Sequence, residues 1–346
     1  MNPHTKLISY LSLFLGTTIT ISSNHWMMAW MGLEINTLAI MPLISKPHHP
    51  RAIEATVKYF LVQAAASALV LFASTINAWH TGQWDLTQMT HPTACLLLTT
   101  AIAMKLGLVP FHFWFPEVLQ GSTLTTALLL STVMKLPPIS ILFLTHHTLD
   151  PTLLTTMAIT STALGGWMGL NQTQTRKILA FSSISHLGWM AIIILYNPKL
   201  TLLTFYLYTL MTSTVFLTLN STKTLKLSTM MISWTKAPVL NTTLMLTLLS
   251  LAGLPPLTGF LPKWLIIQEL TKQEMVPAAT TIALLSLLSL FFYLRLAYYT
   301  TITLPPNPTN TMKQWHTNKP TNTMIATLSS LSILLLPLSP MILTAT

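Results

Sequence analysis

The stretch Gly107-Leu-Val-Pro110-Phe-His-Phe-Trp-Phe-Pro116-Glu-Val-Leu119 is matched 146 residues later by Gly253-Leu-Pro-Pro256-Leu-Thr-Gly-Phe-Leu-Pro262-Lys-Trp-Leu265. A Gly-Leu pair, two prolines and a final leucine recur at the same spacing. Proline removes a backbone hydrogen bond and clashes with the preceding turn of a helix. Both stretches are therefore predicted to break a helix within or near the membrane, as many transporters do.

The sequence around these two stretches is strongly apolar. The chain has 346 residues, a mean hydropathy of +0.60 and 7% charged residues, against roughly 25% in soluble domains. Its uncharged runs reach the roughly 20 residues that a helix needs to cross about 30 Å of hydrocarbon. Because these runs are continuously apolar and do not alternate with period two, they exclude a β-barrel. The sequence predicts an all-α polytopic membrane protein.

Prolines, glycines and polar clusters divide the chain into eleven predicted transmembrane helices. These cover residues 3–22, 25–44, 51–79, 92–109, 122–146, 152–171, 175–195, 199–220, 239–271, 276–301 and 322–343. The breaks belong to the fourth and ninth spans, which are an odd number apart, so the two units have opposite orientation. Within a single membrane domain we predict two inverted five-helix repeats, residues 1–146 and 147–301, and a loop with a C-terminal helix in 302–346.

The basic residues predict the orientation. Of the 17 Lys and Arg, ten fall in loops on the side of the N-terminus and two in loops on the opposite side. Basic loops face the cytoplasm, or the matrix if the membrane is mitochondrial. The N-terminus is expected on that side and the C-terminus on the other. The net charge of +10 then reflects topology, and no nucleic-acid partner is expected.

Four ionisable residues lie inside apolar spans: Glu34, Lys105, Lys135 and Lys263. Such residues cost several kcal/mol in hydrocarbon and usually mark an ion or proton path. A buried carboxylate tends to gain a proton and a buried lysine to lose one, so Glu34 and Lys105 can exchange protonation states. Each lysine also lies beside proline-disrupted helix. The alternative is a buried structural ion pair or a side chain that reaches the membrane surface.

Three further residues are candidates for a relay. His112 and His186 titrate in a useful range, although a histidine satisfied by its neighbours explains each equally well. Glu117 is expected near a helix end. No metal or cofactor site is expected, because Cys95 is the single cysteine, the loop histidines lack acidic neighbours, and no glycine-rich nucleotide loop occurs. Redox chemistry must therefore take place elsewhere.

Several long stretches resemble the chain 2 family of mitochondrially encoded subunits of NADH:ubiquinone oxidoreductase, respiratory complex I, in its vertebrate type. They are His25–Asn36, Lys105–Gly121, Met134–Pro138, Asn171–Gly188 and Leu254–Trp264. The resemblance implies an antiporter-like subunit of the membrane arm. It also implies that Glu34 and Lys105 match the family's ion pair, Lys135 its central lysine and Lys263 the terminal residue of the exit side.

The same resemblance implies a setting for the chain. The membrane is the mitochondrial inner membrane, with the N-terminus in the matrix and the C-terminus in the intermembrane space, and no cleavable signal is expected. NADH, FMN, iron–sulfur clusters and ubiquinone bind other subunits, while this chain contacts membrane-arm subunits and lipids such as cardiolipin. Larger family members have fourteen helices, and the three that this chain lacks leave the completeness of its proton-uptake channel open.

The leading hypothesis is an enzyme subunit that helps to pump protons without redox chemistry of its own. One alternative is a stand-alone cation/proton antiporter of the same fold, which should keep acidic cation ligands, whereas Glu34 is the one acid firmly in mid-membrane. The other alternative is a structural subunit that conducts nothing. Substitution of Lys135 or Lys263 would then leave proton stoichiometry unchanged.

Overall fold

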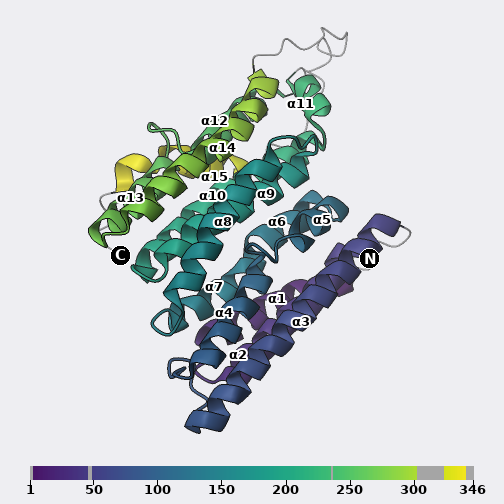
Figure 1. The fold of residues 1–346 in the computed structure, drawn as a ribbon. Coiled ribbons are helices and arrows are strands. Elements are labelled where there is room, and N and C mark those ends of the chain that lie inside the picture. The colour runs from purple at the N-terminus through teal and green to yellow at the C-terminus, as the bar shows by residue number, and fades with distance from the viewer. Residues whose placement is uncertain (1–2, 46–48, 235–236, 302–322, 340–346) are drawn as a thin grey trace.

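The computed structural model describes residues 3–45, 49–234, 237–301 and 323–339, and most of them are helical. Figure 1 shows the helices side by side along a common direction, with α1–α4 on one flank of the molecule, α12 and α14 on the other, and α8–α10 between them. The predicted all-α class is confirmed for these residues.

The helices follow the chain in an order close to the predicted one. Up to residue 145 they are α1 (Pro3–Ser22), α2 (Trp26–Ile44), α3 (Pro50–Thr81), α4 (Pro92–Leu106), α5 (Trp114–Gly121), α6 (Leu124–Ser131), the 3-10 turn η1 (Val133–Lys135) and α7 (Leu136–Thr145). Beyond it they are α8 (Pro151–Gly169), α9 (Thr175–Ile193), α10 (Pro198–Thr222), α11 (Leu227–Ser233), α12 (Pro238–Ala252), α13 (Phe260–Lys272), α14 (Val276–Thr301), α15 (Thr323–Leu334) and the 3-10 turn η3 (Leu336–Leu338). The short helix α11 lies where the sequence predicted only a loop.

Five segments of the described chain are long and apolar enough to cross a membrane. They are α2, α3, Leu124–Thr145, α10 and α14, while α4, α12 and α15 are apolar but shorter. Many threonines and serines in the other long helices donate to carbonyls of their own helix, as Thr17 Oγ1 does to Phe14 O at 2.8 Å. Such bonds satisfy hydroxyl groups without water. The chain is a multi-pass membrane protein, and the number eleven remains a prediction.

Both predicted helix breaks are present, and their local structures correspond at the same 146-residue offset. Helix α4 ends at Gly107 with φ 78° and α12 ends at Gly253 with φ 83°. In each case the residue after the glycine donates to a carbonyl five positions earlier, a six-to-one bond that closes a helix end. A left-handed residue is needed there, so glycine ends each helix, three residues before the matching prolines Pro110 and Pro256. The helix resumes at Trp114 and at Phe260.

The predicted fifth span opens at a different point from the expected one. Pro137 and Pro138 do not interrupt a helix but begin α7, where proline fits because the first helical N–H groups need no partner. The irregular backbone precedes them, at Thr132 (φ −116°, ψ −72°) and the 3-10 turn that ends at Lys135. Lys135 therefore lies at the junction between two helical pieces.

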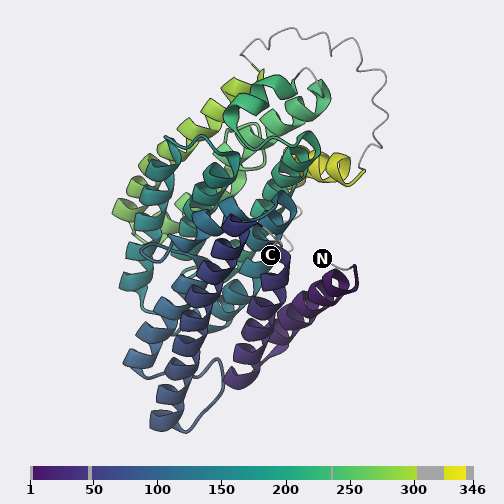
Figure 2. The ribbon, with the colours of Figure 1, turned by 90° about the vertical axis from the view of Figure 1, so that its right-hand side faces the viewer.

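Close helix packing holds the centre of the molecule together. A Cβ on Gly165 of α8 would lie 2.9 Å from the carbonyl oxygen of Phe181, and one on Gly188 of α9 would lie 2.7 Å from that of Ala158. Small residues let membrane helices approach in this way. Figure 2 shows α1 at one edge of the molecule and α15 apart from it, where α15 contacts α10 and α12.

Candidate functional site

The first group of ionisable residues joins helices α2, α3 and α4. Glu34 comes from α2, Tyr59 from α3 and Lys105 from the last turn of α4, where the helix dipole favours a cation. Tyr59 is 1% and Lys105 6% exposed. Glu34 is close enough to interact electrostatically with both. The structure thus brings together the predicted Glu34–Lys105 pair and adds a tyrosine that the sequence analysis missed.

These three residues are poorly satisfied in the described part of the chain. The Lys105 ammonium, the Tyr59 hydroxyl and one carboxylate oxygen of Glu34 are buried without a hydrogen-bond partner. No ion pair within 4.0 Å joins Glu34 to Lys105 among the described residues. Because an isolated buried charge is costly, such groups favour neutral forms or take up a proton or water. The group therefore offers buried polar atoms to which a water molecule or a proton could bind.

The second group surrounds Lys135 at the junction of η1 and α7. Its ammonium, on a residue 3% exposed, donates to the Tyr208 hydroxyl at 3.5 Å. The same ammonium lies 4.8 Å from the ring centroid of Phe115 and 5.2 Å from that of Tyr208, which are cation–π distances. In the described structure Lys135 has no carboxylate partner in an ion pair. Aromatic faces and one hydroxyl therefore take the place of a counter-ion.

Tyr208 connects Lys135 to His186. The ring centroids of Tyr208 and His186 are 5.5 Å apart, and His186 Nε2 lies 3.3 Å from the hydroxyl of Tyr293 on α14. His186 is also within electrostatic range of both Lys135 and Lys263. A hydroxyl can donate one proton and accept another, so a tyrosine between two titratable groups can pass a proton. Sequence reasoning missed Tyr208 and Tyr293, although a tyrosine in the middle of an apolar span was an available signal.

Lys263 lines a small cavity together with Tyr208 and His186. The cavity has a volume of about 20 Å³, enough for about one water molecule. His186, Tyr208 and Lys263 line it, together with Trp189, whose ring centroid is 5.9 Å from the Lys263 ammonium. The ammonium itself donates to the carbonyl of Ala252, at the end of α12, at 2.7 Å. Lys135, Tyr208, His186 and Lys263 therefore form a row of polar groups through the apolar core.

The remaining candidates lie apart from this row. His112 is 1% exposed in the first break, and neither ring nitrogen has a hydrogen-bond partner among the described residues. The side chain of Glu117 is 50% exposed and accepts from Lys58 at 2.6 Å, while Lys58 also binds Glu54 at 2.5 Å. Glu117 thus belongs to a surface charge cluster. In the described chain no three His, Cys, Asp or Glu residues lie together in a way that could hold a metal ion.

Family profiles cover nearly the whole chain. The profile described as "NADH:quinone oxidoreductase/Mrp antiporter, TM" matches residues 23–289, and "NADH dehydrogenase subunit 2 C-terminus" matches residues 290–343. Among curated relatives, the NADH-ubiquinone oxidoreductase chain 2 of Struthio camelus is 80% identical over 345 residues, all of each chain. That of Gallus gallus is 75% identical over 99% of each chain.

Solved structures share the fold. A chain of respiratory complex I from Thermus thermophilus superposes with a TM-score of 0.84 at 26% identity, over 97% of this chain and 80% of its own length. A chain of the Mrp complex from Dietzia sp. gives a TM-score of 0.77 at 16% identity, over 86% of this chain and 61% of its own length, and shows the fold alone. Together with the profiles and the relatives, these matches place the chain in the NADH:quinone oxidoreductase/Mrp antiporter family, among its NADH-ubiquinone oxidoreductase chain 2 members.

Proposed function

We propose that this chain is a membrane-arm subunit of respiratory complex I and moves protons through the row of Lys135, Tyr208, His186 and Lys263. The family membership supports the subunit role and the H⁺-translocating NADH:ubiquinone oxidoreductase activity of the whole. The observation that carries the proton path is the contact of Lys135 with Tyr208, continued to His186 and to a water-sized cavity beside Lys263.

The path has an order. Glu34 and Lys105 receive the coupling signal, Lys135 holds a proton at the junction of η1 and α7, and Lys263 releases it. The Lys135 ammonium gives its proton to the Tyr208 oxygen while that hydroxyl releases its own toward His186. A water in the cavity carries the proton on to Lys263. His112, which is buried and has no hydrogen-bond partner among the described residues, is a further candidate for proton uptake. Glu117 could take part in proton uptake only from the protein surface, where Lys58 binds it.

The energy comes from outside the chain. Moving one elementary charge against the membrane potential costs about 2.3 kcal/mol per 100 mV. NADH, FMN, iron–sulfur clusters and ubiquinone are assigned to other subunits. A change in the Glu34–Lys105 interaction shifts the proton affinity of Lys135 electrostatically, because the residues packed around them are mostly buried and apolar, and charges interact strongly in such a low-dielectric interior. The unpartnered atoms of Glu34, Tyr59 and Lys105 support such a sensitive first step.

The proposal includes the finer architecture and setting. Eleven spans cross the mitochondrial inner membrane, with the N-terminus in the matrix and the C-terminus in the intermembrane space. Residues 1–146 and 147–301 are inverted repeats within one membrane domain. The loop predicted before the last helix lies outside the described residues, as does the end of the predicted span 322–343, of which the structure describes α15. The matching helix ends at Gly107 and Gly253 support the repeat. Other membrane-arm subunits and anionic lipids such as cardiolipin are its partners.

The test removes one hydroxyl from the row. Tyr208→Phe in the assembled complex keeps the ring over which the Lys135 ammonium lies but deletes the oxygen that accepts from it. We expect proton translocation per electron to fall, and the coupled rate to drop by about a hundredfold, the lower range for loss of a proton-transfer group. The measurement is NADH-driven acidification in proteoliposomes against NADH consumption.

A matched control lies two residues away. Tyr206 is on the same helix, is 54% exposed and contributes nothing to the row, so Tyr206→Phe should leave both rates unchanged. An unaltered proton-to-electron ratio in the Tyr208 variant, with normal assembly, would exclude this path. Recovery of the isolated chain as an active transporter would instead favour the stand-alone antiporter.

A further inference from the structure

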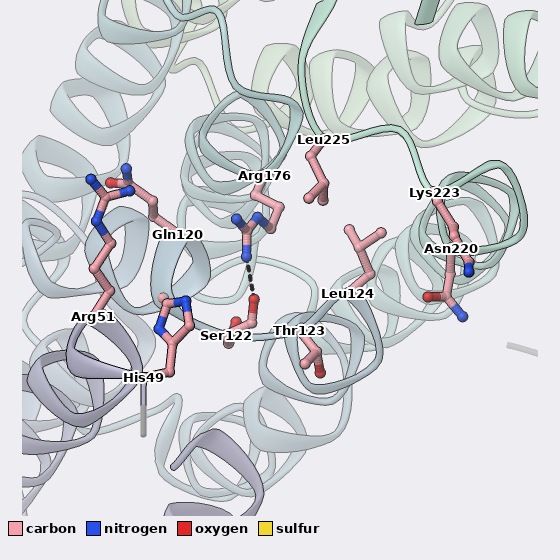
Figure 3. A pocket seen from close by; sticks show the side chains of 11 residues that line it. His49, Arg51, Gln120, Ser122, Thr123, Leu124, Arg176, Asn220, Lys223 and Leu225 are labelled. Atoms are coloured by element: carbon pink, nitrogen blue, oxygen red, sulfur yellow. Dashed lines mark hydrogen bonds between the residues drawn. The ribbon is translucent and has the colours of Figure 1, made fainter. Parts of the chain in front are cut away.

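A second polar site lies at the end of the helix bundle where α3, α6 and α9 begin and α5 and α10 end. It is a pocket of about 460 Å³. Its lining includes Arg51, Ser122, Thr123, Arg176 and Lys223. Figure 3 shows Arg176 between Arg51 on one side and Lys223 on the other. The proposed proton path does not use any of these residues.

The pocket carries a net positive charge. Arg51, Arg176 and Lys223 line it, no acidic residue does, and in the described chain none of the three forms an ion pair. The two acids beside it, Glu54 and Glu117, share the single cation Lys58 and line a neighbouring pocket with Arg51, so they offset one of the three positive charges at most. The pocket thus offers cationic donors to an anion from outside the chain.

One of the cations is held in place. Arg176 donates through Nη1 to the carbonyl of Ser122, in the turn between α5 and α6. A guanidinium has five N–H donors, so this bond fixes its position and leaves others free for a ligand. Arginine held this way suits a phosphate group, which accepts several charge-assisted hydrogen bonds.

The pocket is also partly apolar. Leu124 and Leu225 line it beside the basic side chains. It opens at the end of membrane helices, on the side that carries most of the basic loops. A cationic rim beside an apolar wall fits a ligand with a phosphate group and a hydrocarbon part, and basic pockets between membrane helices bind anionic lipid headgroups.

We propose that this pocket binds a phosphate-bearing anion, and that its source is the headgroup of an anionic phospholipid seated at the membrane surface. The inference rests on the membrane placement in the proposed function but not on the proton path. Arg51 and Lys223 contact the phosphate from opposite sides, and Arg176 holds it from the base of the pocket. The acyl chains leave past Leu124 and Leu225.

The test compares charge loss inside and outside the pocket. The complex carrying Arg51→Gln with Lys223→Gln is washed in mild detergent, its bound phospholipid is counted by native mass spectrometry, and vesicles of phosphatidylcholine with cardiolipin are then added back. We expect the double variant to retain one anionic phospholipid fewer and to rebind it about tenfold more weakly, since each surface cation contributes measurably. Lys6→Gln with Lys226→Gln removes the same two charges on the same side but outside the pocket, and should behave as the native chain.

Two further comparisons distinguish a phospholipid from free phosphate, and lipid binding from proton pumping. Arg51→Lys with Lys223→Arg keeps both charges and should retain the lipid, which excludes a folding defect as the cause. The proposal of a phospholipid ligand would be wrong if the native complex bound inorganic phosphate in the pocket and retained no lipid. It would also be wrong if the double variant retained as much anionic phospholipid as the native complex. With lipid in excess the double variant should pump protons normally, whereas Tyr208→Phe should fail to pump and still retain the lipid.

Discussion

The two broken helices end and resume at matching positions but differ in the side chains that satisfy their ends. In the first, the indole N–H of Trp114 donates to the carbonyl of Met104 at 3.2 Å, and Lys105 precedes the break with no hydrogen-bond partner for its side chain among the described residues. In the second, no tryptophan occupies the matching position, and Lys263 after the break donates to the carbonyl of Ala252. A carbonyl at the end of the first broken helix accepts from the neutral indole of Trp114, and a carbonyl at the end of the second accepts from the Lys263 ammonium.

This difference has a functional consequence. A lysine without a partner responds to a small change in its surroundings, which suits the input role proposed for Lys105. A lysine bound to a helix-end carbonyl and beside a cavity is fixed in place, which suits release to water and the role proposed for Lys263. Each of the following experiments alters one break and uses the other, or a matched residue, for comparison.

The largest effect is expected from the residues at matching positions 117 and 263. Lys263→Met removes the proton-binding group and should lower coupled turnover by on the order of a hundredfold. Glu117→Gln alters a side chain that is half exposed and paired with Lys58, and should change turnover little. Proton-to-electron ratios in proteoliposomes measure both. Equal losses in the two variants would mean that the breaks have the same function.

An intermediate effect is expected from the two helix-ending glycines. Alanine at Gly107 or Gly253 must adopt a left-handed backbone, which costs about 1–2 kcal/mol. At Gly253 the new methyl group would lie 2.9 Å from the Lys263 side chain, whereas at Gly107 the nearest atom is 3.5 Å away. Displacing Lys263 also breaks its charged hydrogen bond, worth about 1.5–3 kcal/mol.

Gly253→Ala should therefore destabilise the complex more than Gly107→Ala, and it alone should reduce proton pumping. Thermal denaturation of the purified complex and the pumping assay give the two readouts. Equal losses of stability, with pumping retained in both, would show that Lys263 can leave the Ala252 carbonyl without consequence.

The smallest effect is expected from the neutral closure of the first break. Trp114→Phe deletes the hydrogen bond to Met104 and should cost about 1 kcal/mol beyond the loss of ring area. Trp26→Phe is the matched control, because Trp26 is 1% exposed and its indole nitrogen has no partner in the described structure. The difference between the denaturation midpoints isolates the bond. A larger loss of stability in the Trp26 variant would mean that the packing of the ring contributes more than the hydrogen bond from Trp114 to Met104.

The sequence predicted the fold class and the break positions for clear physical reasons. Long uncharged runs have no stable state in water, and glycine followed by proline cannot continue a helix. It misplaced the opening near Lys135, because prolines at the start of a helix and prolines that interrupt one look alike in a sequence. The short helix α11 was missed for a different reason, since its seven residues are apolar in part but too few to cross a membrane or to show a helical period.

The sequence by itself determined that the chain is helical and membrane-bound, and that Glu34, Lys105, Lys135 and Lys263 are unusual, since one charge in an apolar run is visible without coordinates. Only the tertiary structure decided their surroundings. Tyr59 lies on α3 and Tyr208 on α10, which are not the helices that carry Glu34, Lys105 or Lys135. The sequence does not show which group a tyrosine hydroxyl will contact, because that depends on how the helices pack. The structure likewise showed that Lys58 binds both Glu54 and Glu117, and that three cations at separate helix ends share one pocket, because Glu117 and these cations come together only in space.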